Sequence, residues 1–217
     1  MKLKAFILLA SVLLFSSCIV KSIQPFYTKG DLSYTEKLIG IWTDQKGGVW
    51  DVISMKEQFM KDQKENSNVS EDDKKAFEAY KEGYIVKYVK KEKEVVFIAM
   101  PFQLEGQYFL DFIPFEFDTE SINHLAAEHL IKTHSVAKLD INAAQKISFS
   151  WLTEERIKTL FNDNKLRLKH EIVGPEEALL LTASSQELSA FLKKYLTASI
   201  EDKWKSSDAL TLTKNTI

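Results

Sequence analysis

Apolar and polar residues alternate in many short stretches of this chain, a pattern typical of β-strands with one buried face. Turn residues such as Gly, Asp and Pro separate these stretches at short spacing, so we expect neighbouring strands to pair in antiparallel fashion. The stretches 95–103 and 108–117 are apolar at nearly every position, and we expect both faces of each to be covered. The expected strands are 38–43, 49–55, 84–90, 95–103, 108–117, 133–140, 146–152, 166–173, 178–183 and 210–213.

Three other segments carry helical signals. Residues 56–82 are rich in charged residues, and Ser70 followed by three acidic residues is a good helix start, so we expect a helical insertion on the surface. The segment 153–162 is a second expected helix, with a threonine as its N-cap. Ser184 and Glu187 have the spacing of a capping box before a third helix. The apolar residues of that helix at helical spacing are Leu188, Phe191, Leu192 and Tyr195.

These elements predict an α+β protein that is mostly antiparallel β. Eight to ten short strands that follow one another closely favour a closed or partly closed barrel with about three peripheral helices. A β-sandwich is the main alternative, because it shows the same pattern of short alternating strands. The sequence has no linker rich in Pro, Gly or Ser, so we expect a single domain.

The first expected strand contains Gly40, Ile41 and Trp42, with Leu38 before them. This Gly-x-Trp sequence resembles the start of lipocalin barrels. The resemblance implies a lipocalin-like barrel in which Trp42 closes one end, with an arginine of the last strand packed over the ring. Lys214 is the nearest basic residue here, and it lacks the planar group that would stack on the indole. The family also implies a carrier of small apolar ligands. The alternative is a core tryptophan on an ordinary strand.

The N-terminal residues have the order of a secretory signal peptide. Lys2 and Lys4 precede an apolar run at 5–15, and two serines then precede Cys18. The run is too short to span a bilayer, which needs about 20 apolar residues. We therefore expect this segment to direct the chain out of the cytoplasm.

The serines and Cys18 resemble the lipobox of bacterial lipoproteins, with Phe15 where the commonest form has leucine. The resemblance implies cleavage before Cys18, a diacylglyceryl group on its sulfur and a fatty acyl group on its amino group. Residues 1–17 would then be a signal peptide, 18–30 a lipidated tether and 31–217 the β-rich domain. The implied location is the cell envelope, at the outer membrane of a Gram-negative bacterium, with the protein held to the membrane through this lipid anchor. An ordinary signal peptide with a chance cysteine is the alternative.

Composition narrows the classes of partner. The formal charge is −2, and loss of Lys2 and Lys4 with the signal peptide would make it −4, which argues against a nucleic-acid partner. Cys18 is the only cysteine, so the mature protein would have no disulfide and no free thiol for catalysis. Arginine occurs only at positions 156 and 167.

No motif predicts catalysis. The sequence lacks Gly-x-Ser-x-Gly and a glycine-rich phosphate loop, so we expect no catalytic residues and no enzyme activity. The first three histidines are spaced by five, which places no two of them on one face of a helix. Positions five apart on a strand face opposite ways, and we expect no metal site. Apart from the covalent lipid on Cys18 we expect no cofactor. The histidines are His124, His129, His134 and His170, and the adjacent acidic pairs, expected to be solvated, are Glu154-Glu155 and Glu176-Glu177.

The sequence thus predicts a membrane-anchored envelope lipoprotein without enzymatic activity. The first hypothesis is a binding module for a small apolar ligand or for a segment of a partner. The alternative is a structural or assembly lipoprotein that docks on another envelope protein. An apolar cavity inside the barrel would favour a ligand carrier, whereas a filled barrel with exposed apolar surface would favour docking.

Overall fold

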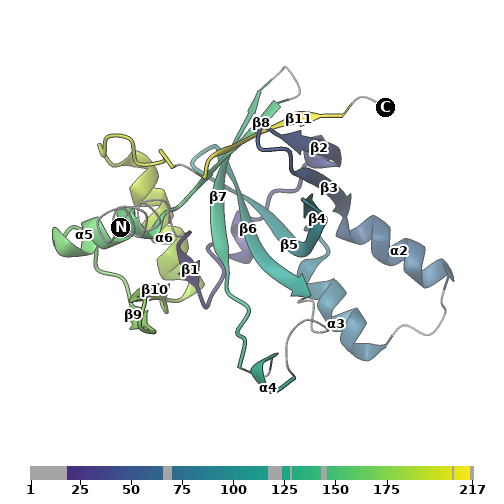
Figure 1. Cartoon of the computed structure of the whole chain (residues 1–217), viewed down its shortest axis with the longest axis horizontal. Helices are drawn as coiled ribbons and strands as arrows, with labels where there is room; N and C mark the ends of the chain where they lie inside the picture. The colour runs from purple at the N-terminus through teal and green to yellow at the C-terminus, as the bar shows by residue number, and fades with distance from the viewer. Residues whose placement is uncertain are drawn as a thin grey trace, which may run out of the picture.

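Eight antiparallel strands close into a barrel in the order β11-β2-β3-β4-β5-β6-β7-β8 (Figure 1). The computed structural model describes residues 19–65, 70–116, 124–127, 129–142, 146–206 and 208–215. Cys18 and the expected signal peptide lie outside these described residues. The strands are β2 (Gly40–Asp44), β3 (Val49–Ser54), β4 (Tyr84–Lys90), β5 (Lys93–Leu104), β6 (Gln107–Glu116), β7 (Ser135–Asn142), β8 (Lys146–Trp151) and β11 (Leu210–Lys214).

The last strand closes the barrel. β11 pairs with β2 on one side and with β8 on the other, both in antiparallel register. The α+β class and the lipocalin-like barrel with peripheral helices are therefore confirmed, and the sandwich is excluded.

Helices lie outside the barrel. α2 (Met55–Glu65) and α3 (Glu71–Tyr80) connect β3 to β4 in the region expected to be a helical insertion, and Ser70 caps α3. The remaining helices are α4 (His124–Ala127), α5 (Glu154–Asn162), α6 (Ser185–Thr197) and the short 3₁₀ turns η1 (Lys29–Asp31) and η2 (Glu36–Leu38). Ser184 and Glu187 form the expected capping box of α6. None of the described helices combines the length and the apolar character that a membrane-spanning helix needs.

A second, three-stranded sheet lies beside the barrel. It has the order β1 (Lys21–Ser22), β10 (Ala178–Leu181) and β9 (His170–Val173), with β1 parallel to β10. The expected strand at 166–173 therefore starts four residues too early. Leu166 and Leu168 alternate with charged residues, but they pack against a hydrophobic core formed by helices and strands and do not enter a sheet.

The segment expected to be a tether is part of the folded body. Val20 and Phe26 have no exposed surface. The amide of Val20 donates to the carbonyl of Leu152 at 2.9 Å, and the amide of Ser22 donates to the carbonyl of His134 at 2.9 Å. Burial of apolar side chains and pairing of backbone groups fix this stretch, so the described residues before 31 also belong to the folded domain.

Two hydrophobic cores share the wall of the barrel. One core fills the interior of the barrel. The other, which we call the outer core, lies between the outer face of the barrel, the three-stranded sheet, α5 and α6. β5 and β6 contribute to both, and the rings of Phe102 and Phe109 stack at 5.2 Å in the outer core. Because both faces of these strands are covered, they are apolar at nearly every position, as expected.

Candidate functional site

Side chains fill the interior of the barrel. The void inside it measures about 10 Å³ and is lined by residues such as Trp42, Trp50 and Phe112. A single water molecule needs about 10–15 Å³. The barrel therefore has no room for a small apolar ligand, and a binding site has to be sought on its outside.

Trp42 is buried in this core, as expected. Its indole Nε1 donates to the carbonyl of Leu38 at 2.8 Å, so the polar edge of the ring is satisfied. The ammonium of Lys214 lies 5.3 Å from the ring centroid. A lysine thus occupies the place over the ring that the lipocalin resemblance gives to an arginine, and a cation–π contact replaces the planar stack.

Gly40 makes this arrangement possible in a way that the sequence did not indicate. Its φ of +121° is rarely adopted by residues with a side chain, and a Cβ there would lie 3.1 Å from Cε of Lys214. The space beside Gly40 is therefore occupied by the stem of Lys214. Gly40 and Trp42 both have structural roles.

Asp44 organises the turn between β2 and β3. Its carboxylate accepts hydrogen bonds from the indole of Trp50 at 2.9 Å and from the amides of Gly48 and Lys46 at 2.9 and 2.8 Å. Burial acts to raise the pKa of Asp44, but these hydrogen bonds outweigh it and hold the pKa below its ordinary value of 3.8. The charged carboxylate therefore stabilises the hairpin.

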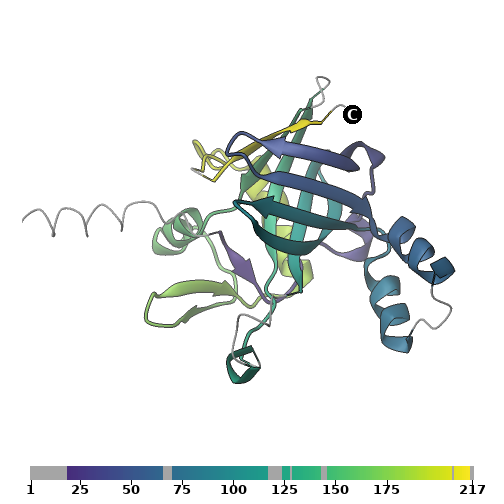
Figure 2. The same cartoon turned by 45° about the vertical axis from the view of Figure 1, so that its right-hand side comes forward.

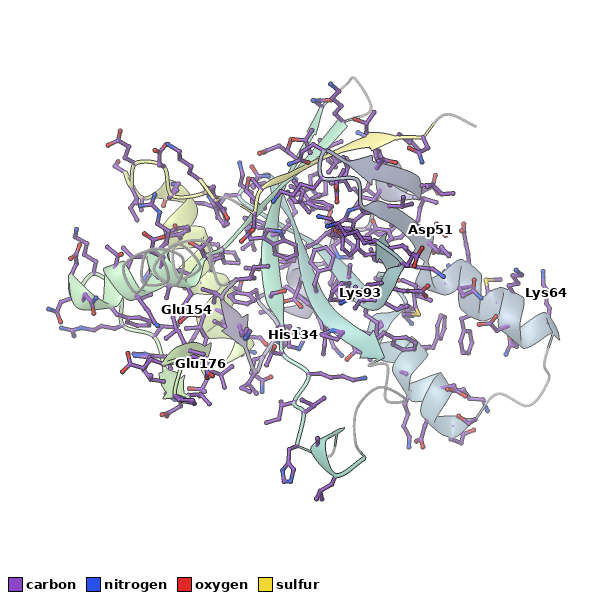
Figure 3. The ribbon with its side chains drawn as sticks, viewed as in Figure 1. Asp51, Lys64, Lys93, His134, Glu154 and Glu176 are labelled. Carbon is purple, nitrogen blue, oxygen red and sulfur yellow. The ribbon has the colours of Figure 1, made fainter. Side chains whose placement is uncertain are left out.

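A buried pair joins the N-terminal segment to the barrel. Oδ1 of Asp111, on β6, lies 2.6 Å from Nδ1 of His134, and Oδ2 accepts from the amide of Phe26 at 2.8 Å (Figure 3 labels His134). Burial raises the pKa of Asp111, while the hydrogen bond and charge of His134 and the amide of Phe26 oppose the rise. Since both carboxylate oxygens have partners in the fold, we assign the pair a structural role. His134 is thus buried rather than exposed, and its Nδ1 is paired with a carboxylate.

The other candidate residues do not converge. His129 is exposed, and the ring of His170 stacks on Phe161 with the ring centroids 3.9 Å apart. The side chain of His124 lies outside the described part of the chain. Within the described residues, no group of three or more His, Cys, Asp or Glu could hold a metal ion.

One of the acidic pairs differs from its expectation. Glu154 is buried, accepts from the amide of Leu179 at 2.9 Å and pairs with Lys158 at 2.7 Å (Figure 3). It connects α5 to β10. Glu155, Glu176 and Glu177 are exposed, as expected for solvated groups.

A half-open cleft of about 330 Å³ lies between the α2–α3 pair and the outer wall of the barrel; we call it the α2–α3 cleft. Tyr84 and Val86 point into the barrel core, so Ile85 between them faces outward, and it pairs in register with Ile98 of β5. These two residues form the floor of the cleft. The other lining residues are Met55, Gln58, Phe59, Asp62, Asp73, Ala76, Tyr80 and Phe115.

Stacked aromatic rings hold the two helices of this cleft together. The rings of Phe59 on α2 and Phe77 on α3 are nearly parallel, with centroids 4.0 Å apart. Three aromatic residues inside an otherwise charged segment were the available sequence signal. That signal predicts amphipathic helices, but it does not say which face of the barrel they cover.

The fold and the cleft are the basis for any functional proposal. No protein-family model, no curated protein and no solved structure matches the chain.

Proposed function

We propose that this protein is a non-enzymatic lipoprotein of the bacterial cell envelope that is anchored through Cys18 and binds an apolar segment of a partner protein in the α2–α3 cleft. The contrast between the barrel and its outer wall carries the proposal. The interior void of about 10 Å³ is too small for a ligand, whereas the outer cleft of about 330 Å³ is open and mostly apolar.

Exposed apolar side chains favour a partner segment over a small molecule. Met60 on α2 is 49% exposed, and Phe115 at the edge of the cleft is 36% exposed. Apolar surface therefore continues beyond the cleft, which suits a larger contact than a small ligand makes. The cleft itself is at the low end of the range for small-molecule sites, about 300–1,000 Å³.

The position of the cleft agrees with an anchored protein. Ile19, the residue after Cys18, forms a β-bridge with Thr153 at the start of α5. α5 and α6 lie on one side of the barrel and α2 and α3 on the opposite side (Figure 1, Figure 2). A membrane-bound Cys18 would thus leave the α2–α3 cleft directed away from the membrane, where a partner can reach it.

Photo-crosslinking in intact cells tests this function. A photoreactive phenylalanine analogue at Phe115, at the cleft, should crosslink one protein that the same analogue at the exposed Ile41 of β2 does not capture. Ala76→Arg, which places a charge in the cleft, should abolish that crosslink. Ala79→Arg, on the same helix but outside the cleft, should leave it intact.

A Cys18→Ser variant tests the anchor in the same cells. It should no longer incorporate labelled fatty acid or remain in the membrane fraction. Labelling unchanged in Cys18→Ser refutes the anchor, and a crosslink unchanged in Ala76→Arg refutes the docking site. If instead organic solvent releases one apolar molecule per chain from the wild type but not from Ala76→Arg, the cleft is a small-ligand site.

A further inference from the structure

A second cleft, of about 680 Å³, lies between α6 and the segment that ends α5 and follows it; we call it the α5–α6 cleft. Its lining includes Leu160, Leu166 and Leu168 from the α5 side and Phe191 and Ile200 from the α6 side. Phe191 and Leu160 belong to the outer core, and the other three are half-buried. The floor of this cleft is therefore apolar and rigidly supported.

Cations surround this apolar floor. Lys165, Arg167 and Lys194 line the cleft, and Glu187 is the acidic residue among its lining residues. Hydrogen bonds from the backbone and hydroxyl of Ser184 lower the pKa of Glu187 and occupy its carboxylate at the helix start. Lys165 pairs with Asp163 at 2.8 Å. Among the described residues, the exposed Arg167 and Lys194 have no acidic partner, so both are available to an anionic ligand.

The expected anchor is close to this cleft. Ile19 is bridged to Thr153, the N-cap of α5, and Cys18 is joined to Ile19 by one peptide unit of about 3.8 Å. α5 has nine residues, so its axis is about 14 Å long. The α5–α6 cleft begins near the other end of this helix, at Leu160. Because only one peptide unit separates Cys18 from the described fold, a lipidated Cys18 would keep this cleft near the bilayer.

We propose that the α5–α6 cleft binds an anionic phospholipid of the membrane that holds Cys18, with acyl carbons on the apolar floor and the phosphate between Arg167 and Lys194. A guanidinium matches phosphate geometry with two parallel hydrogen bonds, and lysine adds a mobile point charge. An apolar floor of this extent has no role for a free phosphate ion, which favours a lipid. The proposal rests on the anchor of the proposed function, because the anchor brings the cleft to the lipid.

Native mass spectrometry of the full chain in neutral detergent tests this proposal by counting bound molecules. The probes are dihexanoyl phosphatidylglycerol, dihexanoyl phosphatidylcholine and glycerol 3-phosphate. We expect phosphatidylglycerol to bind at one site, about tenfold or more tighter than either other probe. Arg167→Gln/Lys194→Gln should remove that preference. Lys74→Gln/Lys75→Gln, with the same loss of charge on α3, should keep it.

A second variant tests the apolar part of the site. Ala190 is exposed and lines the cleft, so Ala190→Trp fills part of the cleft and keeps both cationic side chains. This variant should weaken phosphatidylglycerol binding about tenfold. Equal binding of the two lipids, or binding unchanged in the double variant, refutes the proposal. Glycerol 3-phosphate binding as tightly as the lipid would assign the site to a free phosphate. These measurements do not need Cys18 to be acylated, so their failure is separable from failure of the anchor or of the α2–α3 cleft.

Discussion

Trp42 is held by two residues close to it in sequence and by one residue of the last strand. The carbonyl of Leu38 accepts from its indole, Lys214 of the last strand lies over its ring, and Gly40 leaves the space that the lysine stem occupies. Gly40 combines a positive φ with a close approach of the lysine stem, and a Cβ there would crowd that stem. The contact also connects the first and last strands of the barrel.

We predict that Trp42→Ala lowers the free energy of unfolding by about 3–5 kcal/mol, as for other buried large aromatic residues. Lys214→Met keeps the apolar stem and removes the charge, and it should cost about 1 kcal/mol or less. Denaturant titration of both variants measures the difference. A loss below about 1 kcal/mol for Trp42→Ala would show that the ring does not support the core.

The lowered pKa of Asp44 predicts that the stability of the protein decreases in acid. Its pKa is lower in the folded state than the ordinary 3.8, so its stabilising contribution is fully present above that value. The contribution is lost as the pH falls through the lower, folded-state pKa. We therefore expect the difference in unfolding free energy between the wild type and Asp44→Asn to shrink between pH 6 and pH 3.

Paired denaturant titrations at the two pH values measure this difference. Comparison with Asp44→Asn removes the effect of other carboxylates with lowered pKa values, such as those of Asp31 and Glu187. A difference that is the same at both pH values would mean that the charge of Asp44 contributes nothing.

At the scale of elements, the α2–α3 pair is an insertion into a hairpin. β3 ends at Ser54 and β4 begins at Tyr84, and these two residues pair directly in the antiparallel register. Two residues are enough to connect a pair of strands at this point. The helices are therefore not needed to set the register of the barrel.

We predict that replacing residues 55–83 by an Asn-Gly turn leaves a barrel that unfolds cooperatively, because the interior core keeps all of its side chains. The loss of stability should be smaller than that of Trp42→Ala, and the crosslink from Phe115 should disappear. Near-ultraviolet circular dichroism and thermal unfolding check the fold. A chain that no longer unfolds cooperatively would show that the helices belong to the core.

The sequence predicts elements better than it predicts where they lie. Alternation along the strands and the capping boxes at Ser70 and Ser184 are local, and both were sufficient to place most of the elements. The predicted start of β9 was wrong because Leu166 and Leu168 alternate as a strand does but pack against the outer core without entering a sheet. The α2–α3 cleft and the Asp111–His134 pair depend on residues brought together by the fold, which no local pattern encodes.

At the scale of the whole molecule, the helices that line the two clefts, α2 and α3 for one and α5 and α6 for the other, lie on opposite sides of the barrel (Figure 1). The barrel acts as a filled, rigid spacer between them rather than as a container. The two sides of the barrel differ because α5, α6 and the N-terminal segment pack, through the outer core, on one wall only. A protein of this form can contact a membrane and a partner at the same time.

The closing strand has a consequence for when the protein can fold. β11 pairs with both β2 and β8, so those strands have unpaired edges until residues 210–214 are available. The amides of Val20 and Ser22 likewise have no hydrogen-bond acceptors until Leu152 and His134 are available. Contacts so distant in sequence form slowly. For the exported lipoprotein proposed above, this order of events keeps the chain unfolded during passage through a translocation channel, and the barrel closes only after its last strand has crossed.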